Sequence, residues 1–165
     1  MKLIAALLMA FALAGISSAA QEQGGQAPRQ PIEFNHRLHA GTLKVQCKMC
    51  HPNADPGETM GLPEVSTCMQ CHSAIAPKNE AMQKLQAFAK QDRDVDWVRI
   101  YQIPSYVTFN HRTHLNTGAT CETCHGAVAQ RTALFKEKEI SMGACMDCHR
   151  EKQASIDCGY CHAPR

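Results

Sequence analysis

Five copies of one short motif, Cys-x-x-Cys-His, constrain this chain more than any other feature of its sequence. All ten cysteines of the 165-residue chain lie in these motifs: Cys47, Cys50, Cys68, Cys71, Cys121, Cys124, Cys145, Cys148, Cys158 and Cys161. We number the motifs 1 to 5 in chain order; they occupy residues 47–51, 68–72, 121–125, 145–149 and 158–162. Any interpretation of the cysteines therefore has to explain why a histidine directly follows every pair.

This motif is the attachment signature of c-type haem. Its two thiols add to the two vinyl groups of one porphyrin, and the adjacent histidine is held where its imidazole can bind the iron from one side. We therefore predict five covalently attached haem c groups. Their proximal iron ligands would be His51, His72, His125, His149 and His162.

Other uses of paired cysteines explain the pattern less well. Four-thiolate zinc sites take cysteine pairs two at a time, whereas this chain has five pairs. A cysteine-rich exported chain would ordinarily suggest disulfides. Neither use requires a histidine after every pair. A thioredoxin-like redox pair would need only one motif, placed in a βαβ pattern.

Residues 1–20 have the pattern of a secretory signal peptide. A single charge, Lys2, precedes an apolar run from Leu3 to Ile16, and small residues at 18–20 offer a cleavage site before Gln21. The run is shorter than the roughly 20 residues of a spanning helix, and an uncleaved N-terminal anchor stays open as the alternative. Export predicts a periplasmic location, which agrees with thioether attachment outside the bacterial cytoplasm.

The composition favours a core made of cofactor. Aromatic residues are only 5 % of the chain, with one Trp, which is little material for an ordinary hydrophobic core. Porphyrins would supply the apolar surface that side chains cover. We expect a mostly irregular fold with short α-helices, in which the haems form the core. The formal charge of +2 omits the haem propionates, so it gives no reason to expect nucleic acid as a partner.

A second repeat, Phe-Asn-His-Arg-x-His, precedes motifs 1 and 3 at residues 34–39 and 109–114. Such a repeat indicates one structural unit used twice. We predict a flexible tether at 21–31, a two-haem module at 32–76, a linker at 77–105 and a three-haem module at 106–165. In the linker, Asn79 is expected to cap a helix that runs to about Gln91. Residues 97–101 alternate as in a short strand, which Pro104 ends.

The four histidines outside the motifs all lie in this second repeat: His36, His39, His111 and His114. Within each copy they are three residues apart, so on a helical turn they share a face and can reach two different irons as distal ligands. Five irons need ten axial ligands, and histidine supplies nine. For the tenth we favour Met142. Met60 or another residue, and an open or water-bound site, are the alternatives; Met142 would then only pack against a haem face.

The histidine blocks together with the Cys-x-x-Cys-His motifs resemble the class III multihaem cytochromes, the c3/c7 group. Residues 97–99, 103–104, 109–114 and 142–150 are more closely similar to the multihaem subunits of bacterial quinol-oxidising membrane complexes. These include the pentahaem subunit of alternative complex III and its menaquinone-reductase relative. The resemblance covers roughly residues 32–163. It implies haems at short distances, mainly bis-histidine iron and one methionine-ligated haem.

Bis-histidine iron has no position for a substrate, so we predict outer-sphere electron transfer and no catalytic residue. The expected partners are redox proteins, such as iron–sulfur or quinol-oxidising subunits of a membrane complex. Membrane contact would come through that partner or through an uncleaved anchor. A free periplasmic carrier, a reductase that uses an open fifth haem, and a haem-stacking filament subunit are the alternatives.

Overall fold

The chain folds into short helices joined by long irregular segments. The computed structural model describes residues 25–53 and 59–162, so the predicted signal peptide lies outside the described residues. In chain order the elements are η1 (Arg37–Thr42), α1 (Cys47–Cys50), α2 (Val65–His72), α3 (Glu80–Lys90), α4 (His111–Asn116), α5 (Cys121–His125), η2 (Val128–Gln130), α6 (Met142–Glu151) and α7 (Cys158–Cys161). No residue in this part of the chain is in a strand. The predicted fold class, mostly irregular with short helices, is confirmed.

Every Cys-x-x-Cys-His motif coincides with a helical turn. Motifs 1, 3 and 5 make up nearly all of α1, α5 and α7, whereas motifs 2 and 4 lie in the later parts of α2 and α6. Residues three apart on a helix lie on one face. Each turn therefore presents its two thiols on the same side, as a single planar group bonded to both would require.

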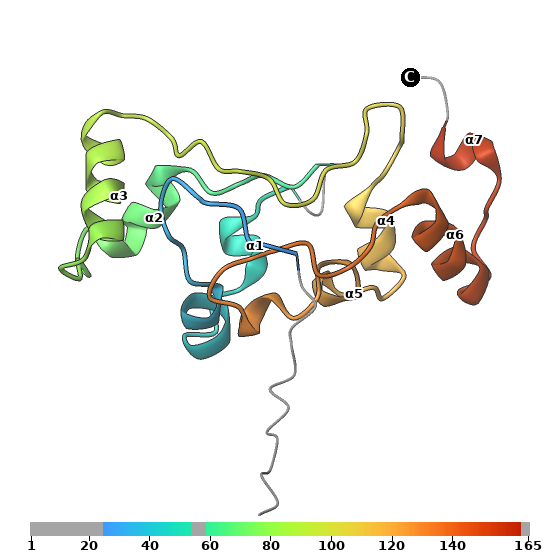
Figure 1. The fold of residues 1–165 in the computed structure, drawn as a ribbon, viewed down its shortest axis with the longest axis horizontal. Helices are drawn as coiled ribbons and strands as arrows, with labels where there is room; N and C mark the ends of the chain where they lie inside the picture. Colours follow the sequence, from blue (N-terminus) through green and yellow to red (C-terminus); the bar gives the residue numbers. More distant parts are fainter. Residues whose placement is uncertain (1–24, 54–58, 163–165) are drawn as a thin grey trace, which may run out of the picture.

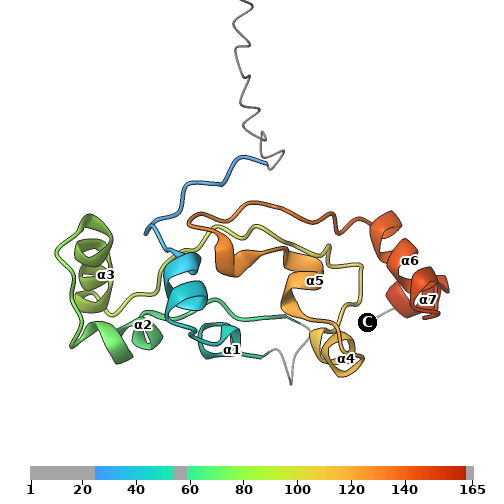
Figure 2. The same cartoon turned by 90° about the horizontal axis from the view of Figure 1, so that it is seen from below.

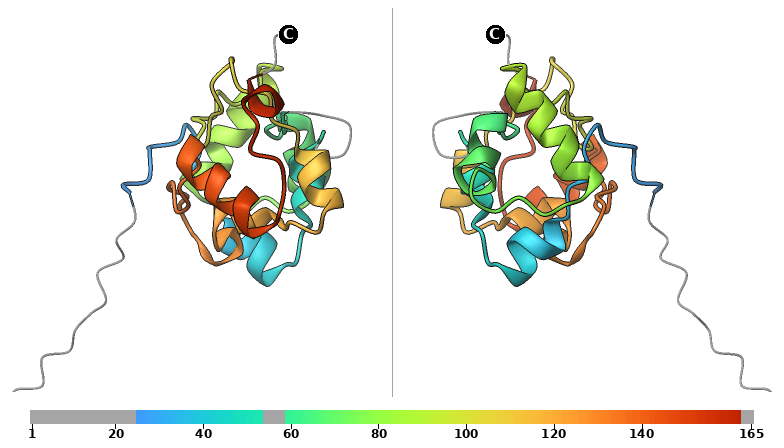
Figure 3. Two further views of the ribbon diagram at one scale, coloured as in Figure 1. Left: turned by 90° about the vertical axis from the view of Figure 1, so that its right-hand side faces the viewer. Right: turned by 90° about the vertical axis from the view of Figure 1, so that its left-hand side faces the viewer.

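The helices follow one another along an elongated molecule. In Figure 1, α2 and α3 lie at one end, α6 and α7 at the other, and α1 and α5 between them. The perpendicular view in Figure 2 gives the same sequence of elements. Figure 3 views the molecule from its two ends: α6 and α7 are in front in one view, and α3 is in front in the other. No helix of the described residues is long and apolar enough to cross a membrane.

The hydrophobic core is small and lies at one end. Its buried members are Ile32, Val65, Met82, Leu85 and Val95. It forms where α2 packs against α3. The predicted linker helix is confirmed here: the Asn79 side chain accepts a hydrogen bond from the backbone N–H of Met82 at 2.8 Å. Glu80 and Lys84, four residues apart on this helix, form an ion pair at 2.7 Å.

The short strand predicted at residues 97–101 is wrong. The backbone there finds a side chain as its partner instead of a second strand. The amide of Gln30 donates to the carbonyl of Val98 and accepts from its N–H, both at 2.9 Å. This pair of bonds satisfies Val98 as a neighbouring strand would, and it also fastens the C-terminal end of the predicted tether to the linker.

The two predicted modules meet through η1 and η2. The backbone N–H of Arg37 donates to the carbonyl of Arg131 at 2.8 Å. Gly41 lies so close to the carbonyl of Ala129 that a Cβ at this position would clash with it. A glycine is therefore needed here because the two backbones approach each other, and the first and second modules are held together at this point.

Candidate haem sites

The structure brings the predicted distal and proximal histidines together in four pairs. His36 faces His51 and His111 faces His125, each with ring centroids 6.5 Å apart and planes within 8° of parallel. His39 faces His72 and His114 faces His149, each at 6.1 Å. Each copy of the histidine block therefore faces the proximal histidines of two motifs in its own predicted module.

The spacing of these rings suits two imidazoles on opposite sides of one metal ion. Imidazole nitrogen binds first-row metal ions such as zinc at about 2.0–2.1 Å. Adding the distance from that nitrogen to the ring centre gives centroids about 6–6.5 Å apart across a shared ion. All four pairs have this spacing, so the residues present fit bis-histidine iron.

Backbone carbonyls orient most of these rings through Nδ1. At the proximal positions, Nδ1 of His51, His72 and His149 lies 3.0, 2.7 and 2.6 Å from the carbonyls of Gly61, Ile75 and Ser155. At the distal positions, His39 and His114 bond to the carbonyls of Asn35 and Asn110 at 2.9 and 2.8 Å. A carbonyl partner holds the proton on Nδ1, which leaves Nε2 with its lone pair for a metal.

The Phe-Asn-His block builds the same local structure twice. Phe34 stacks on His39 at 4.4 Å and meets His36 edge-on at 4.7 Å. Phe109 likewise stacks on His114 at 4.6 Å and meets His111 edge-on at 4.8 Å. The phenylalanine thus packs against both distal rings of its copy and restricts their orientation. This explains physically why the block recurs as a unit.

Burial keeps two of the histidines in the neutral form that binds metal. Desolvation, followed by the nearby His51 and His39, lowers the pKa of His36 to about 4. Desolvation, followed by His111 and His51, also lowers the pKa of His125. A metal-binding imidazole must be unprotonated. Both rings are therefore ready to act as ligands at neutral pH.

No disulfide joins any of the ten cysteines, and all of them are exposed or half-buried. Desolvation is the main reason why the pKa values of Cys50, Cys68, Cys121, Cys124 and Cys145 are raised. A raised pKa keeps a thiol protonated and weakly nucleophilic. Without the porphyrin, these side chains are available for attachment and slow to react with other electrophiles.

The fifth motif differs from the other four. The four distal histidines each face another motif, and the ring beside His162 is that of Tyr106, at 6.1 Å. The backbone carbonyl of Tyr106 also bonds to Nδ1 of His162 at 3.3 Å. Met142, the favoured tenth ligand, begins α6 and is 67 % exposed. Methionine ligation of one iron stays a prediction.

Sequence reasoning missed a cluster around motif 3. The ring of Tyr101 meets His125 edge-on at 4.7 Å, and its hydroxyl accepts hydrogen bonds from the backbone N–H groups of Glu137 and Lys138 at 2.9 and 3.0 Å. The Glu137 carboxylate bonds to Arg131 at 2.9 Å and to the N–H of Ala127 at 3.1 Å. These partners are distant in sequence and belong to no motif, so no pattern pointed to them.

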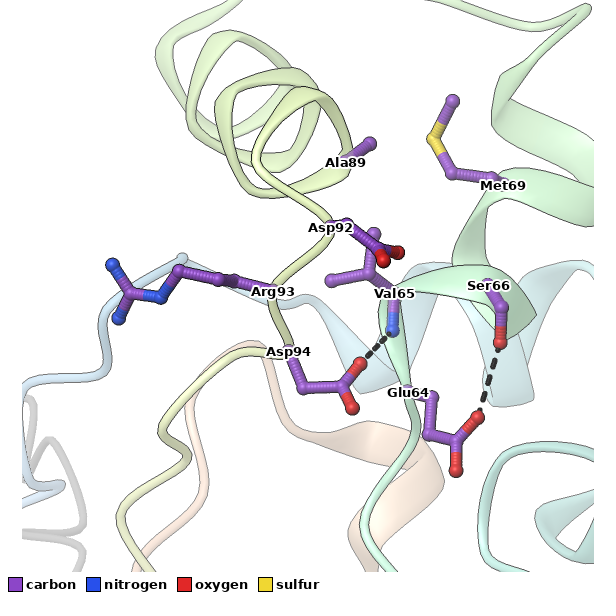
Figure 4. A pocket seen from close by; sticks show the side chains of 8 residues that line it. All are labelled: Glu64, Val65, Ser66, Met69, Ala89, Asp92, Arg93 and Asp94. Atoms are coloured by element: carbon purple, nitrogen blue, oxygen red, sulfur yellow. Dashed lines mark hydrogen bonds between the residues drawn. The ribbon is translucent and has the colours of Figure 1, made fainter.

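A groove of about 280 Å³ lies beside motif 2, between the start of α2 and the end of α3. Figure 4 shows Asp94 pointing at the N-terminus of α2, where its carboxylate accepts from the N–H of Val65 at 2.8 Å. Glu64 accepts from the Ser66 hydroxyl at 3.2 Å in the same view. The Asp94 carboxylate thus satisfies one free N–H at the start of α2, which is a structural role.

Comparison with known proteins agrees with the geometry. Residues 14–99 match the Class III cytochrome C family, and residues 107–163 match the family described as cytochrome c7 and related cytochrome c. Over 121 residues the chain is 31 % identical to the menaquinone reductase multiheme cytochrome c subunit of Nitratidesulfovibrio vulgaris strain Hildenborough. The alignment covers 73 % of this chain and 51 % of that relative, so the chain spans about half of its length.

Proposed function

The chain belongs to the class III cytochrome c family, and from that premise we propose that it is a pentahaem electron relay of the bacterial periplasm. Multihaem electron transfer is the activity of the family. The number of haems, the location and the role as a relay subunit or docked partner of a membrane quinol oxidoreductase are our proposal. In this proposal the chain transfers electrons, and any catalysis takes place on other subunits of the complex.

Three sets of residues would attach the haems, bind their iron and orient the ligand rings. The cysteine pairs would hold each porphyrin covalently, and the nine histidines would bind iron. The carbonyls bonded to Nδ1 and the two phenylalanines would fix the direction of the rings. When bound, haem iron accepts and releases one electron at a time, and with two histidine ligands it leaves no position for a substrate.

The observation that supports this proposal best is the set of four facing histidine pairs at 6.1–6.5 Å. Two further observations support the finer points. The signal-like pattern of residues 1–20 supports export. The relative named as a menaquinone reductase subunit supports a quinol-linked partner complex, with iron–sulfur or quinol-oxidising subunits as the expected neighbours.

The test is production of the full chain together with a cytochrome c maturation system. We expect a mass increase equal to five haems and a low-temperature electron paramagnetic resonance spectrum dominated by low-spin ferric iron. Colourless protein with the mass of the bare polypeptide would overturn the proposal. Co-purification with membranes after native expression would distinguish a docked subunit from a free carrier.

One observation favours a second candidate function. His162 lies beside Tyr106 and not beside a histidine, so the fifth iron could keep an open position and reduce a small molecule there. Carbon monoxide binding to the reduced protein separates the two functions: a relay with ten axial ligands does not bind it, whereas an open fifth site does.

A further inference from the structure

The five motifs do not lie in space in the order in which they occur in the chain. Motif 1 has neighbours on both sides. The thiol of Cys121 in motif 3 lies beside that of Cys47 in motif 1. Cys50, also in motif 1, lies near Cys71 and Cys68 of motif 2. Motif 1 therefore lies between motifs 2 and 3.

The backbone supports this position of motif 1. The contact between η1 and η2, with its bond from Arg37 to Arg131 at 2.8 Å, places the segments around motifs 1 and 3 against each other. The imidazole of His51 is also close enough to His125 to act on it electrostatically. Motif 2 lies on the other side of motif 1, beside α3, as both Figure 1 and Figure 2 show.

Motifs 4 and 5 continue the series away from motif 3. Cys145 of motif 4 lies near Cys124 of motif 3 and Cys161 of motif 5. Motif 5 is further fixed by a hydrogen bond of 2.7 Å from the N–H of Thr108 to the carbonyl of Cys161. In Figure 1, α5, α6 and α7 accordingly follow one another toward the end of the molecule opposite α3.

We propose that the five redox sites form a single row in the order 2-1-3-4-5, and that electrons pass between the two modules through motifs 1 and 3. This inference rests on the proposed function and specifies its path. Motif 2 and motif 5 are then the two ends at which electrons enter and leave. Motif 2, and not motif 1, therefore lies at one end of the row, and motif 1 lies second.

The order can be tested by counting how many haem signals change when one motif is removed. No signal has to be assigned to a particular motif for this count. The variants Cys68→Ala/Cys71→Ala and Cys47→Ala/Cys50→Ala each remove one attachment site, which the mass of the purified protein verifies. In the ferric protein, neighbouring haems alter one another's paramagnetic resonance signals. Removing motif 2 should perturb one remaining site, because motif 2 is an end. Removing motif 1 should perturb two.

Chain order predicts the reverse, one perturbed site on removal of motif 1 and two on removal of motif 2, and that result would overturn the inference. Where a variant fails to fold, His36→Met and His39→Met provide a matched pair that keeps all five attachment motifs. Methionine raises the potential of its own site. We expect His36→Met to shift the midpoint potentials of two other sites and His39→Met those of one; the opposite counts overturn the row.

The same measurements separate failure of this inference from failure of the proposed function. If the protein carries five haems but the numbers of perturbed sites are those expected for the order 1-2-3-4-5, only the proposed row is contradicted. Protein without haem contradicts the proposed function as well.

Discussion

His36 and His51 face each other with ring planes 2° apart and centroids 6.5 Å apart, although one precedes η1 and the other follows α1. The intervening chain makes a turn that returns to its start: the N–H of Val45 bonds to the carbonyl of His39 at 2.9 Å. This fold-back brings two histidines that are close in sequence face to face. The block before motif 3 repeats it with His111 and His125.

Replacing His36 by alanine should open one iron. Without the distal imidazole, one site loses its sixth ligand, so one low-spin signal should become high-spin and the reduced protein should gain one carbon monoxide site. Electron paramagnetic resonance and carbon monoxide titration measure both effects. Leu38→Ala is the matched control, because Leu38 is in the same turn and 46 % exposed; a high-spin signal in this control would contradict the assignment.

Asn110 caps α4, which carries two predicted distal ligands, whereas Asn79 caps α3, which carries none. The side chain of Asn110 accepts from the N–H of Thr113 at 3.2 Å, and loss of either cap should cost about 1 kcal/mol of stability. Asn110→Ala should also disturb the distal ligands on α4 and broaden the haem spectrum. Asn79→Ala should lower the unfolding temperature alone. Equal spectral changes in both variants would argue against this separation.

Protonation of His36 should cost stability in acid. Burial, then His51 and His39, lowers the pKa of His36 to about 4 from its usual 6.5. Since its folded pKa is depressed, its contribution to stability is complete above pH 6.5 and is lost as the pH falls toward 4. Thermal unfolding measured across this range should show the loss. His36→Met should lack this part of the pH dependence, and an unchanged profile would count against it.

Met142 should control the highest potential of the protein. Thioether ligation raises the potential of haem iron, so Met142→His should lower the most positive midpoint in a redox titration. Met146→Leu, one turn later on α6, is the control and should leave that midpoint in place. An unchanged highest potential in Met142→His would show that another group is the tenth ligand.

Removing the hydroxyl of Tyr101 should loosen the segment behind motif 3. Tyr101→Phe keeps the ring on His125 but leaves two N–H groups, of Glu137 and Lys138, without their acceptor. We expect a loss of about 1 kcal/mol in the free energy of unfolding with little change in the spectrum. Tyr160→Phe, at a side chain that is 71 % exposed, should have almost no effect. Equal losses in both variants would contradict the role of Tyr101.

Local sequence patterns predicted the parts of this protein that depend on neighbours in the chain. The haem motifs and the low aromatic content predicted a mostly irregular fold with short helices, the histidine blocks predicted residues that now face four proximal rings, and Asn79 predicted the start of α3. The strand at 97–101 failed because Gln30, more than sixty residues away, satisfies Val98. Tyr106 and Glu137 were missed for the same reason. Long-range contacts leave no periodic signal in a single sequence.

The position of the small core has a consequence for biogenesis. Ile32, Val65, Met82, Leu85 and Val95 gather where α2 meets α3, so only this end of the molecule can become compact from side chains alone. In a polypeptide whose haems are not yet attached, most of the thiols would lie on chain that has no hydrophobic core of its own. Haem insertion would then be the event that completes folding.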